Sequence, residues 1–136
     1  MSKRTFVTYG LLVVLLAVIV PWLAFRARGD ADADVAKVPA SLERGQSLFQ
    51  TNCGACHMLA AAGTDGNFGP DLDQLLAPGG PVDDQAAVTA LEGRVLNAID
   101  NGVDGTTTAG RMPGGILAGE QAEEVARFVA QTAGRG

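Results

Sequence analysis

Side chains that can bind a metal ion or form a disulfide are rare in this sequence of 136 residues. It contains two cysteines and one histidine, and all three lie between positions 53 and 57. A structural zinc site needs four ligands, so this pattern argues against one. Aromatic residues are also scarce, at 5% of the chain. A small domain with so few large side chains is expected to need a metal, disulfides or a large cofactor for stability.

Basic residues are scarce after the first 29 positions. Those positions hold four basic residues and no acidic ones, whereas positions 30–136 hold fifteen acidic and six basic residues, a net charge of −9. The acidic part has no basic patch, which argues against nucleic acid as a partner. A basic, apolar start followed by an acidic body is typical of a membrane segment attached to a soluble domain.

The uncharged segment from Thr5 to Phe25 is 21 residues long. As a helix it would measure roughly 30 Å, the thickness of the hydrocarbon core of a bilayer. We therefore predict a single transmembrane helix, with residues 1–25 as a membrane anchor. A cleaved signal peptide is the alternative, but its apolar part should span only about 7–15 residues and end at a small-x-small site. Here the apolar run is longer, and Arg26-Ala27-Arg28 follows it.

Residues 26–40 are predicted to form a flexible acidic linker, because the alternating Asp and Ala at positions 30–34 offer no large side chain to bury. Residues 41–136 then form the soluble domain. Apolar side chains recur there at helical spacing, and Gly and Pro mark the ends of these stretches. No alternating strand pattern and no repeat is visible, so the domain is predicted to be all-α. Four helices are expected, over about 41–52, 71–76, 86–100 (or 91–100) and 119–132, with Ser41 and Asp71 as N-caps.

The stretch from Cys53 to His57 has the Cys-x-x-Cys-His pattern of c-type haem attachment. Two thiols one turn apart can bond the two vinyl-derived positions of one porphyrin, and the adjacent imidazole can then bind the iron. A redox-active dithiol would be expected beside a strand–helix–strand pattern, which is absent. A disulfide between the cysteines would leave His57 without a role. We therefore predict one covalent haem c, with thioethers at Cys53 and Cys56 and with His57 as an iron ligand.

Met112 is the predicted second ligand of the haem iron. Met1 begins the anchor, and Met58, next to His57, cannot reach the opposite face of the haem. Met112 lies in a Gly-rich stretch before the last helix, where a loop can bring its thioether to the iron and Pro113 stiffens the chain. The alternative is that Met112 fills a gap in the core.

These features resemble, in their order along the chain, the class I cytochrome c family of small mono-haem electron carriers. The resemblance covers about residues 41–133. It implies the cytochrome c fold, four short helices around one covalent haem. It also rests on Gly69-Pro70-Asp71-Leu72 and on the helix end from Leu96 to Gly102.

The resemblance also implies roles for residues outside the haem motif. The carbonyl of Pro70 would accept a hydrogen bond from the imidazole of His57 and so fix the ring. Gly45 would let the first and last helices cross closely, with Phe49 and Phe128 packed there. The chain departs from the family pattern in having Phe at position 128, a long loop over residues 103–110 and almost no lysine.

With His57 and Met112 both on the iron, no coordination site is open for a substrate, so electron transfer is the expected function. The resemblance implies that a quinol-oxidising complex supplies the electrons and that an oxidase or other terminal acceptor takes them. Because c-type haem is attached outside the cytoplasm, the domain is expected on the extracytoplasmic side of the cell membrane. A fixed haem subunit of a respiratory or dehydrogenase complex is the alternative. A peroxidase or gas sensor would need five-coordinate iron.

Overall fold

The structure is a computed structural model that describes residues 3–31, 38–105 and 110–135, and the side chains of 3–6 and 24–31 are not among the parts described. Contacts within the chain divide it into two compact units, Met1–Asp34 and Val35–Gly136. Each unit is considered by itself.

The first unit is one helix, α1 (Lys3–Ala31), which contains Pro21. Every side chain described in it, from position 7 to position 23, is exposed. Among the residues described, no helix meets the criteria of length and hydropathy for crossing a membrane. Residues 26–31 were predicted to belong to a flexible linker but are helical, because extending a helix adds a hydrogen bond without a new nucleus. Residues 32–37 of that linker lie outside the described part of the chain.

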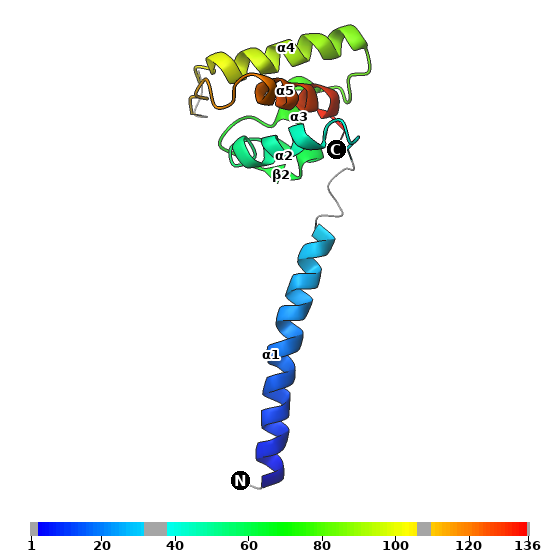
Figure 1. The fold of residues 1–136 in the computed structure, drawn as a ribbon, viewed down its shortest axis with the longest axis vertical. Coiled ribbons are helices and arrows are strands. Elements are labelled where there is room, and N and C mark those ends of the chain that lie inside the picture. The colour runs from blue at the N-terminus through cyan, green and yellow to red at the C-terminus, as the bar shows by residue number, and fades with distance from the viewer. Residues whose placement is uncertain (1–2, 32–37, 106–109, 136) are drawn as a thin grey trace. The chain divides into compact units, whose positions relative to one another are not determined.

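The second unit contains the four predicted helices (Figure 1). Their bounds differ from the predicted ones by at most two residues, and the third helix has the earlier of its two predicted starts. The elements are α2 (Glu43–Asn52), β1 (Met58–Leu59), the 3-10 helix η1 (Ala60–Ala62), β2 (Thr64–Asp65), α3 (Leu72–Leu76), α4 (Gln85–Asn101) and α5 (Glu120–Thr132).

Of the two predicted N-caps, one is confirmed and one is wrong. The carboxylate of Asp71 accepts hydrogen bonds from the amides of Asp73 and Gln74, at 2.9 and 3.2 Å, and so caps α3. Ser41 does not cap α2, because Leu42 occupies the N-cap position and no side chain bonds there. A turn closed by the bond from the Leu42 amide to the Pro39 carbonyl (2.8 Å) leads into the helix and places Leu42 in the core.

A small antiparallel pair, β1 with β2, departs from the all-helical prediction. Met58 pairs with Asp65 and Leu59 with Thr64. Strands of two residues are too short to show an alternating pattern, so periodicity could not reveal them. The hydroxyl of Thr64 donates to the carbonyl of His57 at 3.0 Å. The pair therefore fixes the backbone directly at the end of the Cys-x-x-Cys-His stretch.

The core of the domain lies where α5 packs against α2 and α4. A Cβ atom at Gly45 would lie only 2.3 Å from the carbonyl oxygen of Glu124 and 2.7 Å from Cβ of Phe128. Only glycine permits so close a crossing of α2 and α5. The rings of Phe49 and Phe128 pack there with centroids 6.0 Å apart. The close crossing and the aromatic contact implied by the family resemblance are both present.

Candidate haem-binding site

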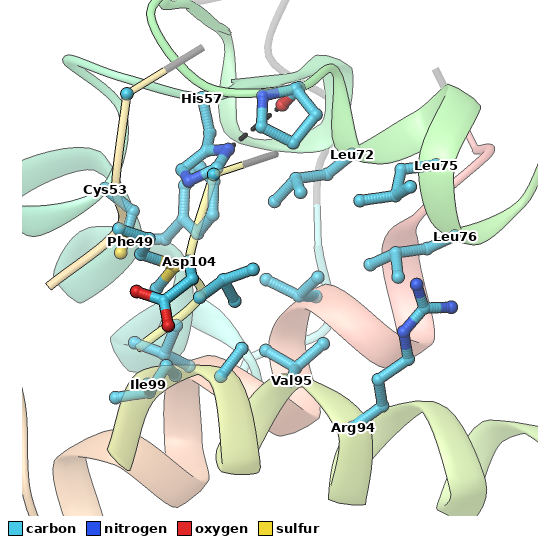
Figure 2. A pocket seen from close by; sticks show the side chains of 18 residues that line it. Phe49, Cys53, His57, Leu72, Leu75, Leu76, Arg94, Val95, Ile99 and Asp104 are labelled. Carbon is cyan, nitrogen blue, oxygen red and sulfur yellow. Dashed lines mark hydrogen bonds between the residues drawn. The ribbon is translucent and has the colours of Figure 1, made fainter. Parts of the chain in front are cut away.

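An apolar cavity of about 320 Å³ opens in the domain (Figure 2). This volume lies at the lower end of the range for ligand pockets in proteins. Its walls come from all four helices and from the loops between them. The helical apolar side chains that line it are Phe49 of α2, Leu72, Leu75 and Leu76 of α3, Val95, Ala98 and Ile99 of α4, and Val125 and Val129 of α5.

Four of the five residues predicted for the site line this cavity. They are Cys53, His57, Pro70 and Met112. The fifth, Cys56, is exposed and lies outside the lining. Residues from positions as far apart as 53 and 112 therefore meet around one apolar space.

The ring of His57 is fixed by a hydrogen bond and by a close backbone contact. Its Nδ1 lies 3.0 Å from the carbonyl oxygen of Pro70, the bond implied by the resemblance. Because a carbonyl can only accept, Nδ1 carries the proton and the lone pair of Nε2 is left for a metal. A Cβ atom at Gly69 would lie 2.5 Å from Cε1 of the ring. The absence of a side chain at Gly69 thus lets the imidazole ring lie against the backbone, a role that was not predicted from the sequence.

The two cysteines follow directly on α2. The amide of Cys53 donates to the carbonyl of Phe49, and the amide of His57 donates to the carbonyl of Cys53 at 2.9 Å. This turn holds Cys53 at the cavity and His57 beside it. Burial, and secondarily the neighbouring Cys56, raises the pKa of the Cys53 thiol to about 11. The free thiol is therefore protonated at neutral pH, whereas a thioether sulfur carries no proton.

Met112 is held by the two ends of its loop. The amide of Val103 donates to the carbonyl of Met112 and the amide of Met112 to that of Val103, each at 3.0 Å. Gly102, at φ +75°, could not carry a side chain, since its Cβ would lie 2.6 Å from the Met112 carbonyl oxygen. An ion pair between Asp104 and Arg111 (2.8 Å) lies next to this bridge. Residues 106–109, within the long loop noted in the sequence, lie outside the described part.

Two charged residues of the cavity, Arg94 and Asp104, were not predicted. Helical spacing could have indicated Arg94, because it lies one turn before Ala98 and next to Val95 on the apolar stripe of α4. Nothing in the local sequence indicated Asp104, since the bridge between Val103 and Met112 is what brings it to the cavity.

The residues at the cavity fit a covalent haem. An imidazole with a free Nε2, a thioether and a thiol surround a largely apolar space, and a second thiol lies nearby. Imidazole and thioether are axial ligands of the iron in cytochromes c. The backbone at Gly69 leaves room only for the ring of His57, which suits a site where that ring must keep one orientation.

Comparison with known proteins agrees with this reading of the cavity. A family model described as cytochrome c matches residues 42–133, which include all four helices of the domain and every residue predicted for the site. A search among curated proteins gave no match. The chain therefore belongs to the cytochrome c family, the electron carriers that hold a covalent haem c and its iron.

Proposed function

We propose that this protein is a single-haem electron carrier anchored to the outer face of a membrane. It would take electrons from a quinol-oxidising complex and pass them to an oxidase or another terminal acceptor. The observation that carries the proposal is that His57 and Met112 line one apolar cavity from different segments of the chain.

The haem iron, when bound, supplies a one-electron couple between Fe(III) and Fe(II). In the proposal, His57 and Met112 are its axial ligands, and Cys53 and Cys56 attach the porphyrin as thioethers. Pro70 keeps the proton of His57 on Nδ1, so Nε2 is the nitrogen left to ligate the iron. The leucines of α3 and the valines of α5 give the site apolar walls.

Exposed apolar side chains support the proposed anchor. From Val7 to Leu23, the large apolar side chains of α1 are each at least 40% exposed within the chain. Such a surface is unfavourable in water and favourable in a bilayer. An anchor would keep the carrier beside membrane-bound partners and so raise its effective concentration.

Charges placed in the middle of α1 should release the full-length protein from membranes. Each arginine at the centre of a spanning helix costs about 2.5–3.5 kcal/mol on insertion scales. We expect the unaltered chain to stay with vesicles after an alkaline carbonate wash, and the variant with Leu12→Arg and Leu16→Arg to be washed off. The matched control places the same charges at Thr89 and Gln121, two exposed positions of α4 and α5, and should remain bound. Release of the unaltered chain would contradict the anchor.

The acidic surface supports partners with basic docking patches. Residues 38–105 and 110–135 carry twelve acidic residues, five arginines and no lysine. Four of these arginines are already in ion pairs, with Glu124, Asp104, Glu92 and Asp83. The remaining negative charge would attract a basic partner and give association rates that fall with salt.

The rate of electron exchange with a small charged reagent should therefore depend on ionic strength, and the change should have opposite signs for a cation and for an anion. We expect reduction by hexaammineruthenium(II), a cation, to slow by about threefold or more between 10 and 300 mM salt, because salt screens the attraction. Oxidation by ferricyanide, an anion, should become faster over the same range. Stopped-flow absorbance of the haem measures both rates, and two rates that are indifferent to salt would contradict docking by charge.

A further inference from the structure

Phe68 connects the segment that fixes His57 with the segment that carries Met112. It directly precedes the Gly-Pro pair that holds the imidazole of His57, and its ring lies against Gly110, two residues before Met112. We propose that Phe68 is a positioning residue, which restrains the Met112 segment by this contact and so keeps the thioether on the iron. This inference rests on the proposed function.

The backbone that follows Phe68 is fixed beside the imidazole of His57. The amide of Gly69 donates to the carbonyl of Cys56 at 2.7 Å. A Cβ atom at Gly69 would lie 2.5 Å from Cε1 of His57, and the carbonyl of Pro70 accepts from Nδ1 of the same ring. The side chain of Phe68 therefore extends from a rigid base at the first predicted ligand of the iron.

The ring of Phe68 lies directly on the backbone of Gly110. A Cβ atom at Gly110 would lie 2.9, 3.5 and 3.8 Å from three carbons of this ring, which are the three atoms nearest to it. Gly110 lines the cavity, whereas Phe68 is 67% exposed and is not part of the lining. The ring therefore acts on the site through Gly110, from outside the cavity.

Other contacts of the Met112 segment hold it to the residues that follow α4. The backbone of Met112 is bridged to that of Val103. The ion pair between Asp104 and Arg111 has side chains that are 82% and 77% exposed, and exposed ion pairs stabilise little. Phe68 adds an apolar contact to the part of the chain that fixes His57, and the strength of such a contact does not depend on charge.

Loss of this contact should make Met112 leave the iron more often. In the oxidised protein, added imidazole can then bind: the Fe–S bond breaks, an Fe–N bond forms, and the iron stays Fe(III). At high imidazole concentration, the rate of this exchange equals the rate at which Met112 leaves. Since about one third of Phe68 is covered, the free energy of covering that part corresponds to about a threefold change in rate.

The test is the limiting rate of imidazole binding to the oxidised, haem-loaded full chain, measured by stopped-flow absorbance. Phe68→Ala should raise this rate about threefold, and Phe68→Leu, which keeps part of the apolar contact, should raise it less. The free energy of unfolding in urea should change little, because Phe68 lies outside the core. Ile116→Ala is the matched control. Ile116 is also exposed and apolar, follows Met112 by four positions and does not line the cavity, so the rate should be unchanged.

Gly110→Ala tests the contact from its other partner. The added methyl group should push the ring of Phe68 away and raise the rate. The φ of Gly110 lies outside the left-handed region, so the backbone accepts alanine. In the Phe68→Ala background the methyl group has no ring to displace, and the lower flexibility of alanine should leave the rate unchanged or reduce it. A general weakening of the segment would not make one substitution depend on the other in this way.

Three results would overturn the proposal. They are a rate of Phe68→Ala equal to that of the unaltered protein, an equal effect of Gly110→Ala in both backgrounds, and a rise in Ile116→Ala as large as that in Phe68→Ala. If Phe68→Ala takes up no haem, Gly110→Ala decides: a faster rate supports the proposal, and an unchanged rate contradicts it. An oxidised spectrum of the unaltered protein without an Fe(III)–Met band would instead refute Met112 as a ligand, and with it the proposed function.

Discussion

Replacing Met112 by alanine should convert the haem iron from a six-coordinate electron carrier into a site that binds carbon monoxide. In the unaltered protein, we expect the near-infrared band of an Fe(III)–Met bond in the oxidised spectrum and no carbon monoxide adduct of the reduced form. Met112→Ala should lose the band and form the adduct. The reduction potential should fall on the order of 0.2 V, because Met ligation raises it and axial ligands tune haem potentials over about 0.8 V.

Met58→Ala is the matched control for this substitution. Met58 is next to His57 in the sequence and 38% exposed, and it does not line the cavity. Its replacement should leave the near-infrared band and the potential as they are. If Met112→Ala kept the band while Met58→Ala lost it, the assignment of the second axial ligand would be wrong.

Adding one methyl group at Gly45 should destabilise the haem-loaded protein by about 2–3 kcal/mol, near the upper end of the cost of overpacking a core. The new Cβ would lie 2.3 Å from the carbonyl oxygen of Glu124, which is backbone and cannot move aside without shifting α5. The shift of α5 should also disturb the haem site, because α2 leads into Cys53 and α5 contributes Val125 and Val129 to the cavity. Urea unfolding followed by circular dichroism measures the change.

Gly93→Ala tests the same chemical change where there is room for it. Gly93 lies inside α4, and a Cβ there would meet no atom within 4 Å. Because alanine favours a helix over glycine by about 0.5–1 kcal/mol, this variant should be more stable than the unaltered protein. Effects of the same sign and size at Gly45 and Gly93 would contradict a close crossing of α2 and α5.

Features that depend on a few neighbouring residues were predictable. The Cys-x-x-Cys-His spacing indicated the haem, and the capping of α3 by Asp71 depends on side chain and amides within three residues. The four helices followed from apolar spacing and from Gly and Pro at their ends. The prediction of Ser41 as the N-cap of α2 was wrong, because the turn from Pro39 to Leu42 places Leu42 at that position. The general preference for serine at N-caps carries no information about such a turn.

The meeting of distant residues was decided by the tertiary structure. The Pro70 carbonyl at His57 Nδ1, the packing of Gly69 against the imidazole, and the bridge of Val103 with Met112 each join residues separated by nine to thirteen positions. The hydrogen bond from His57 to the Pro70 carbonyl and the close crossing at Gly45 were expected only through resemblance to a family.

The sequence by itself thus determined the cofactor and the four helices of the domain, and it predicted the residues that attach the haem, because these follow from local spacing and composition. The tertiary structure decided which side chains share the cavity, and it added Arg94 to them. Arg94 has no ion pair among the described residues and lies across the cavity from Cys53. Spacing along α4 places Arg94 beside the apolar stripe of the helix, but only the folded chain shows which space that side of the helix faces, because the cavity is formed by segments distant in sequence.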